Sequence, residues 1–183
     1  MSASFTDGPK QARAIATRLK LLDAAATCLC ELGARGTTTT AVATAAGVSQ
    51  GALYKHFGSK HLLLAATTEH LLSRLFLAFR MAFGARATDD GDLLSHVLPN
   101  LWAVFLMPEL YAVVELYIVA RTDEALRAAL VPVLDAHRLN LLAEARQLFP
   151  QAAAENPDFD LAVDGIMLAL QGAAMSAAVV EDT

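Results

Sequence analysis

A short polar segment near residue 50 carries side chains that are suited to contacts with nucleic acid. The amide of Gln50 can form paired hydrogen bonds with the edge of an adenine, and the methyl group of Ala52 can touch a thymine methyl. Tyr54 and Lys55 can reach phosphates. If this segment forms a helix, that helix can enter the major groove of DNA.

The residues that flank this segment add further groups for phosphate. Lys60 lies at the expected start of the next helix, whose free N–H groups also favour an anion. Thr38 and Thr40 lie at the start of the preceding helix and are expected to contact phosphate. Gly51 is small and lets the start of the reading helix lie close to the bases. This pattern predicts a DNA-binding surface, and no catalytic constellation accompanies it.

Two short helices joined by a tight corner are expected to position these side chains. An apolar stripe at helical spacing predicts the first helix, with the neighbouring threonines as its N-cap. The stripe consists of Ala41, Val42, Ala45 and Ala46. Gly47 can adopt the left-handed conformation that ends a helix, and Val48 can tuck beneath the corner. Ser49 is a good N-cap for a second helix from Gln50 to about Phe57, which completes a helix-turn-helix.

The same residues resemble a known family at fixed spacing. The pattern is Ala43-x-x-Ala46-Gly47-Val48-Ser49-x-Gly51-x-Leu53-Tyr54-x-His56-Phe57-x-Ser59-Lys60, preceded by Leu21-Leu22-Asp23-Ala24-Ala25-x-x-x-Leu29-x-x-x-Gly33. It resembles the tetracycline-repressor-like (TetR) family of bacterial regulators over about residues 18–64. In that family, the positions that match six residues commonly lie at or near DNA. These six are Gln50, Ala52, Tyr54, Lys55, His56 and Lys60.

The candidate DNA-binding residues extend from the first threonines to the start of the fourth helix. The complete set is Thr38, Thr40, Ser49, Gln50, Gly51, Ala52, Tyr54, Lys55, His56 and Lys60. We expect Leu53 and Phe57 to face the core instead, and His56 fits a structural role equally well. Residues 47–51 also match the G-x-S-x-G pattern of α/β-hydrolases, but that motif follows a β-strand, whereas an alanine-rich helix is expected here.

Charge is distributed unevenly along the chain. The net charge of −5 argues against a nucleic-acid partner until the charges are located. Residues 1–60 hold seven basic residues against three acidic ones, a net charge of +4, whereas residues 61–183 hold seven arginines against sixteen acidic residues, a net charge of −9. A basic first third can meet phosphate, and an acidic remainder is not expected to. Chance scatter of surface charge is the alternative explanation.

The composition indicates an all-α protein. Hydrophobic residues make up 55% of the chain and the mean hydropathy is +0.42, with alanine and leucine supplying much of it. The β-branched alternation typical of strands is missing. We predict an N-terminal three-helix helix-turn-helix domain joined by a long helix to a C-terminal helical bundle, which by resemblance binds ligand and dimerises. The expected divisions are a flexible arm (1–12), a DNA-binding domain (13–64, its connecting helix continuing to 83) and a regulatory and dimerisation domain (65–183).

The remaining helices are expected between turn signals. A first helix should run over 14–32 and a linker over 84–91. Pro99 predicts a kink or early break, and Pro132 should bend or divide the helix that ends near Phe149. The expected helices after the linker are 92–106, 109–121, 123–149 and 159–180, with a loop over 150–158.

Cysteine and histidine spacing gives no sign of a metal or disulfide site. Cys28 and Cys30 lie two apart on a predicted helix and point in different directions. None of the five histidines forms the i, i+4 pair with a glutamate that marks a zinc site on a helix. We expect no metal and no cofactor. Reduced thiols and the lack of a signal-peptide core in the first twenty residues predict a cytoplasmic location.

Aromatic residues gather between Pro99 and Arg121, and Phe76, Phe79 and Phe83 lie on the long fourth helix that is expected before them. Such residues at helical spacing usually mean core, but pockets between bundle helices also take small molecules. By resemblance, an effector binds there and shifts the spacing between the DNA-binding domains of the two subunits. The candidate ligand-binding residues are His70, Phe79, Trp102, Phe105, Tyr111, Glu115 and Tyr117. We expect the effector to be small and apolar or amphipathic.

The last predicted helix is nearly all apolar over residues 161–180. Asp164 and Gln171 argue against a membrane span. Its recurring small residues favour close approach of another helix, and by resemblance this would be the dimer interface; a buried core helix is the alternative. The candidate dimerisation residues are Gly165, Leu168, Gly172 and Met175.

Taken together, these features predict a homodimeric, ligand-responsive regulator that binds a near-palindromic operator on double-stranded DNA and, as is most common in the family, represses transcription. Two other classes stay open. One is a protein-interaction adaptor that has lost DNA binding, and a mobility shift would separate it from a regulator. The other is an enzyme that uses the helical body, which the missing catalytic set disfavours.

Overall fold

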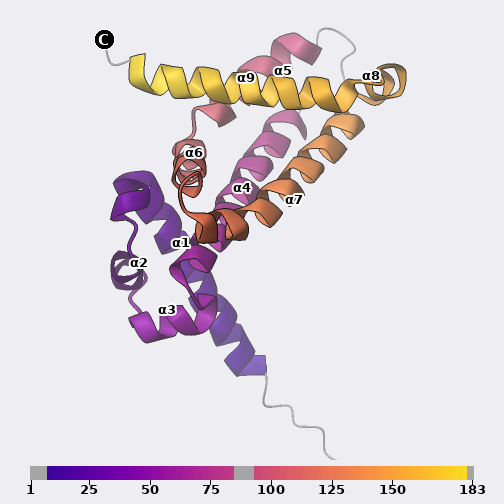
Figure 1. Ribbon diagram of the computed structural model, residues 1–183. Helices are drawn as coiled ribbons and strands as arrows, with labels where there is room; N and C mark the ends of the chain where they lie inside the picture. Colours follow the sequence, from indigo (N-terminus) through magenta and orange to yellow (C-terminus); the bar gives the residue numbers. More distant parts are fainter. Residues whose placement is uncertain (1–7, 85–92, 181–183) are drawn as a thin grey trace, which may run out of the picture.

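Every element in the described part of the chain is a helix, as the composition predicts (Figure 1). The structure is a computed structural model and describes residues 8–84 and 93–180. The helices are α1 (Gly8–Gly36), α2 (Thr39–Ala45), α3 (Gln50–Phe57), α4 (Lys60–Gly84), α5 (Leu93–Phe105), α6 (Pro108–Ala120), α7 (Glu124–Leu148), α8 (Pro150–Glu155) and α9 (Phe159–Val180).

Helices α1, α2 and α3 pack around a small apolar core that also takes in the start of α4. The centre of this core is formed by Leu21, Val42 and Leu53, none of which exposes any surface. Gly33 has φ 66°, a left-handed value that favours glycine, and it interrupts the regular helix of α1 near its end. The Thr37 hydroxyl donates to the Gly33 carbonyl over 2.7 Å, which fixes the turn into α2.

A second core joins α1 and α4 to α6 and α7. It contains Leu29 from α1, Leu71 from α4, Leu116 from α6 and Leu126 from α7, all essentially buried. Since α1 and α4 contribute to both cores, the N-terminal helices and the remaining bundle are packed against each other. The linker predicted for 84–91 falls, apart from Gly84 at the end of α4, outside the described residues.

Several observed boundaries differ from the predicted ones. Helix α1 begins at Gly8, so residues 8–12 of the expected arm are helical; Pro9 in the first turn and the helix-forming residues after it explain this. The expected loop 150–158 contains α8, with Pro150 at the first helical position. Pro132 does not divide α7, because Leu130 and Leu142 are buried on either side of it. Pro99 likewise lies within α5.

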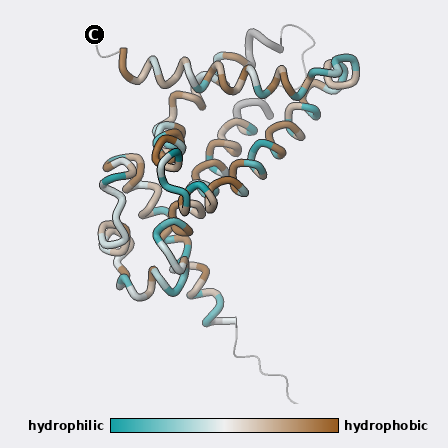
Figure 2. The backbone as a smooth tube through the Cα atoms, in the orientation of Figure 1, coloured by the Kyte–Doolittle hydropathy of each residue, from teal (hydrophilic) through white to brown (hydrophobic). Residues whose placement is uncertain are grey.

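Helix α9 crosses the end of the bundle that is farthest from α3 (Figure 1). Its Ala174 is fully buried in a third cluster with Phe79 of α4 and Leu101 and Phe105 of α5. Hydrophobic residues recur along the whole helix (Figure 2). By length and composition alone, α9, residues 60–81 of α4, and the bent pair of 98–105 with α6 could each cross a membrane. Only 6% of the α9 window is buried within the chain, against 50% of the α4 window, so α9 leaves most of its apolar surface uncovered.

Candidate nucleic-acid interface

The helix-turn-helix is built from local capping interactions that the sequence predicts. Thr38 precedes α2, and its hydroxyl accepts from the N–H of Ala41 over 3.1 Å. Ser49 does the same for α3, accepting from the N–H of Ala52 over 3.2 Å. Gly47 has φ 65° between the two helices. A capping hydroxyl accepts through its oxygen, so both hydroxyls keep a hydrogen to donate to a phosphate.

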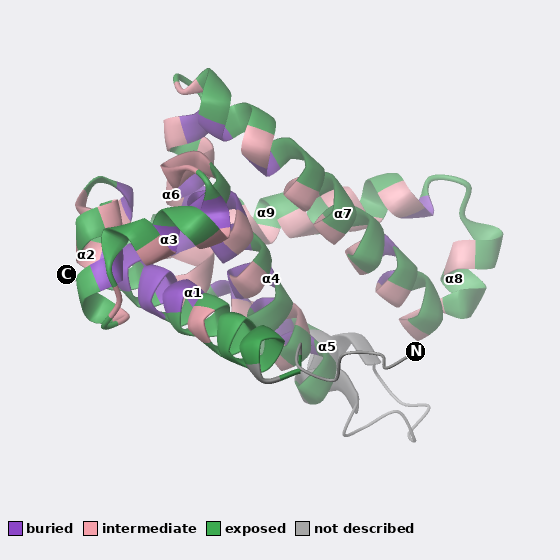
Figure 3. Ribbon diagram, turned by 90° about the horizontal axis from the view of Figure 1, so that it is seen from below, coloured by how far each residue is buried: buried purple, intermediate pink, exposed green. Residues whose placement is uncertain are grey.

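Helix α3 has one buried and one exposed face (Figure 3). Leu53 and Phe57 are buried in the first core, which confirms the prediction for this pair. Gln50, Tyr54 and Lys55 are exposed on the other face, and Gly51 is exposed at the start of the helix. The residues with chemistry for base edges and phosphates therefore lie on the solvent side of α3.

Two side-chain contacts hold the exposed face of α3 against α2. The Gln50 amide donates to the Thr40 hydroxyl, and the Tyr54 hydroxyl lies 3.4 Å from that of Thr39. Four residues, two from α2 and two from α3, are thereby positioned before any ligand arrives. The contact between Gln50 and Thr40 must open if Gln50 is to make paired hydrogen bonds with an adenine.

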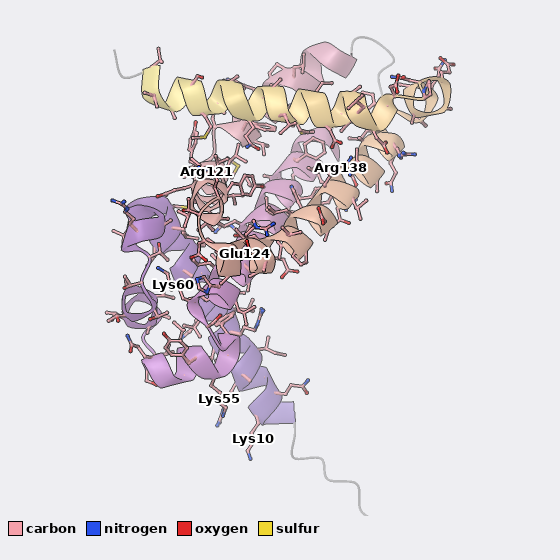
Figure 4. The ribbon with its side chains drawn as sticks, in the orientation of Figure 1. Lys10, Lys55, Lys60, Arg121, Glu124 and Arg138 are labelled. Carbon is pink, nitrogen blue, oxygen red and sulfur yellow. The ribbon has the colours of Figure 1, made fainter. Side chains whose placement is uncertain are left out.

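Basic side chains lie on α3 and on the two long helices that pack near it, α1 and α4. Lys55 and Lys10 both extend from the end of the molecule that is farthest from α9 (Figure 4). Lys60 is half-buried and is the first residue of α4. The residue before it, Ser59, caps this helix, and its hydroxyl accepts from the N–H of Leu62. The Arg18 guanidinium lies over the Phe57 ring, 5.1 Å from its centre. Sequence reasoning did not place Lys10 or Arg18 in the site, since their positions depend on how α1 packs beside α3.

Comparison with known proteins agrees with this geometry. Residues 21–67 match the profile of the bacterial regulatory proteins of the tetR family. The HTH-type transcriptional regulator BetI of Rhizobium meliloti is 32% identical over 148 residues, which cover 80% of this chain and 73% of that protein. The chain belongs to the TetR family. It is a DNA-binding transcriptional regulator, and its relatives are not enzymes.

Two further TetR-type relatives show how far the likeness extends. The HTH-type transcriptional regulator CymR of Pseudomonas putida is 32% identical over 126 residues, 69% of this chain, and the match spans only 62% of CymR. The crystal structure of a putative TetR-family regulator from Rhodococcus sp. superposes with a TM-score of 0.70 at 25% identity, covering 88% of this chain and 86% of the other. The TetR-like arrangement therefore includes the helices beyond the helix-turn-helix.

An apolar cavity lies between α4, α5, α6, α7 and α9, remote from α3. It encloses about 420 Å³ of space, part of it open to solvent. Its lining is almost wholly apolar and consists of Leu72, Leu75, Phe76, Phe79, Leu101, Val104, Phe105, Leu110, His137, Leu141 and Met167. Of the seven predicted ligand-binding residues, only Phe79 and Phe105 are among them.

The other five predicted ligand residues lie outside this lining. His70 Nε2 lies 2.8 Å from Asp23 Oδ1 and joins α4 to α1. The Glu115 carboxylate packs against Gly33, where a β-carbon would lie only 2.9 Å from its oxygens. The Tyr111 hydroxyl donates to the Ala174 carbonyl over 3.4 Å. Trp102 borders the third cluster, and Tyr117, whose pKa burial raises, borders the second core.

His137 is the polar residue in the cavity lining that the sequence did not single out. Burial lowers the pKa of its imidazole, and its ring meets the edge of Phe76 with 6.5 Å between centres. A signal for it does exist in the sequence. Leu130, Leu134, His137 and Leu141 follow one another at helical spacing, so the imidazole interrupts an inward-facing apolar stripe.

Metal chemistry has no support in residues 8–84 and 93–180. Within these ranges no group of three or more His, Cys, Asp or Glu side chains could hold an ion. Cys28 is buried and Cys30 exposed, and both are free thiols whose pKa is raised, mainly by burial.

Proposed function

We propose that this regulator binds a near-palindromic operator as a homodimer, represses transcription from it, and is released by a small molecule. The observation that carries this proposal is the exposed face of α3, which offers Gln50, Tyr54 and Lys55 to solvent above a fully buried Leu53. A helix with this polarity can enter a major groove while its other face stays packed. Repression and a cytoplasmic location are what the TetR family most often implies.

The domain organisation that we propose follows from this arrangement. Residues 13–64 would bind DNA, α4 would connect, and residues 65–183 would serve regulation and dimerisation. We propose that the ten candidate residues contact DNA. Each of them lies on α2 or α3, directly before one of these two helices, or at the first residue of α4. His56 is half-buried and 6.4 Å from the Phe57 ring, so we give it a supporting rather than a reading role.

The dimer would form through the outer face of α9. Gly165, Leu168 and Gly172 are exposed and Met175 is half-buried; Leu168 leaves 67% of its surface in solvent. Small residues on this face let a second helix approach closely. Two ion pairs, Arg138 with Asp164 at 3.0 Å and Arg146 with Asp160 at 2.7 Å, hold α9 on α7. Carboxylates anchored in this way disfavour a membrane and leave a second copy of the chain as the partner.

Ligand control would pass through α4. This helix begins beside α3, with the Ser59 cap and Lys60, and farther along it lines the apolar cavity with Leu72, Phe76 and Phe79. A ligand that binds better when α4 takes a different position must shift the population of the DNA-binding form. The distance between the two DNA-binding domains would then no longer match the spacing of the operator half-sites.

A mobility-shift assay with DNA from the regulator's own promoter tests the proposal. We expect Tyr54→Ala together with Lys55→Ala to abolish the shift, because each subunit loses two phosphate contacts. The variant should keep its helical content and its dimer, since both side chains are exposed. Arg121→Ala, which removes an exposed cation remote from α3, is the matched control and should bind normally (Figure 4). Unchanged DNA affinity in the double variant would sink the assignment.

A further inference from the structure

A second, polar hollow adjoins the apolar cavity between α4 and α7. The two share Leu72, Phe76 and His137. The polar hollow adds Glu69 and Ser73 from α4 and Asn140 from α7, with Val133 and Ala136 completing its wall. Phe76 and His137 therefore stand where an apolar interior passes into a polar opening that carries a carboxylate.

We propose that this composite site takes an organic cation, with its apolar body in the cavity and its positive group at the opening between Glu69 and Phe76. The inference rests on the proposed function, in that it names the chemical class of the effector. It differs from the sequence expectation, which specified only an apolar or amphipathic molecule and a different set of polar residues.

The charges around the opening favour a cation over an anion. Neither hollow has a lysine or arginine in its lining. The nearby arginines of α4 and α7 are already paired: Arg74 with Glu109 at 3.0 Å, Arg80 with Glu144 at 3.2 Å, and Arg138 with Asp164. Among the residues that the structure describes, the Glu69 carboxylate takes part in no ion pair, and its side chain is exposed. An anionic ligand would meet Glu69 without a compensating cation.

The aromatic residues at the junction supply the second attraction. Phe76 stacks on Phe79 with 6.4 Å between ring centres and meets His137 edge-on. A positive group held near an aromatic face gains from the ring quadrupole. Burial lowers the pKa of His137, which disfavours a charged imidazole that would repel such a group.

Three small probes that share a benzyl group and differ in charge test the charge preference. They are benzyltrimethylammonium, its neutral carbon isostere neopentylbenzene, and the anion 3-phenylpropionate. Binding to the intact protein can be followed by calorimetry and by the fluorescence of Trp102, the only tryptophan, which packs beside Phe79 and Phe105. We expect the cation to bind at least about tenfold more tightly than the anion. Equal or tighter binding of the anion would overturn the proposal.

Two matched substitutions locate the preference. Glu69→Gln should lower the affinity for the cation by about fivefold, the effect expected for the loss of an exposed charge pair. The affinity for the neutral isostere should not change. Asp135→Asn removes the same charge from the exposed surface of α7 without touching either hollow, and should change neither probe. If Glu69→Gln weakens both probes alike, or Asp135→Asn has the same effect as Glu69→Gln, the carboxylate does not select the ligand.

DNA release is measured separately, so that the two proposals can fail separately. Addition of benzyltrimethylammonium to the complex with promoter DNA should reduce the mobility shift, and less so for Glu69→Gln. If the cation binds with the expected preference but the shift is unchanged, the site class stands and ligand-driven release is wrong. If the protein binds DNA but shows no preference for the cation, the effector class is wrong and DNA binding stands.

Discussion

Helices α3 and α9 both leave much of their surface in solvent, but their exposed faces have opposite chemistry. The outer face of α3 carries an amide, a phenol and an ammonium group, with Gln50 and Tyr54 held against α2. The outer face of α9 carries Leu161 and Leu168, which are 70% and 67% exposed, between small residues. An exposed polar face needs no partner to be stable in water, whereas an exposed apolar face of this length marks an interface. The contrast teaches that the two ends of the molecule are completed by different partners, DNA at one and, as we propose, a second copy at the other.

The largest effect is expected for a charge placed on the outer face of α9. Leu168→Glu would place a carboxylate from each subunit in the proposed interface without a cation to receive it, and an unpaired buried charge costs several kcal/mol. We expect the dissociation constant of the dimer, measured by analytical ultracentrifugation, to rise by more than about 1,000-fold. Ile15→Glu, at an apolar position on α1 that is 55% exposed, is the control and should leave the dimer intact. A Leu168→Glu protein that stays dimeric would show that α9 does not form the interface.

Salt should separate the two surfaces almost as strongly. If each subunit neutralises about three phosphates, raising the salt from about 50 to 200 mM should lower operator affinity by about 1,000-fold. The dimer contact on α9 is apolar, so its dissociation constant should hardly change over the same range. Parallel titrations by fluorescence anisotropy and sedimentation would give both slopes. A flat slope for DNA binding would rule out phosphate contacts by α3 and its neighbours.

A smaller effect, on stability, is expected from the residue that caps the start of α3. Ser49→Ala removes the hydroxyl that accepts from the N–H of Ala52 and should lower the free energy of unfolding by about 1 kcal/mol. Ser49→Thr keeps an oxygen in that place and should retain most of the stability. Urea denaturation followed by circular dichroism measures both variants. Equal stability of the alanine and threonine variants would show that the cap is not needed.

The helix-turn-helix could be predicted closely because its signals are local. Thr38 and Ser49 cap the helices that follow them, Gly47 takes the left-handed turn, and Leu53 and Phe57 face inward, all as the spacing indicates. Each of these features depends on residues no more than four positions apart, or on one face of a short helix. The final helix, Phe159–Val180, was also placed correctly from its apolar run.

The cavity could not be predicted to the same degree. Its lining comes from α4, α5, α6, α7 and α9, so it depends on how five helices pack. Aromatic residue type pointed to Phe79 and Phe105, but also to Tyr117, which lies on the second core, and it passed over His137. Likewise, His70 was a candidate ligand-binding residue, whereas the fold places its Nε2 2.8 Å from Asp23 Oδ1 on α1.

The sequence by itself determined the reading helix, its caps, the opposite charges of the two parts of the chain and the family to which they belong. These properties depend on the types of residues that lie close together in the chain, because helix periodicity and capping act over short spacings. Only the tertiary structure decided which side chains share the cavity, that Glu69 stands unpaired among the described residues at its polar opening, and that α9 keeps its apolar face uncovered. Those features arise from contacts between helices far apart in the chain, and packing sets them together.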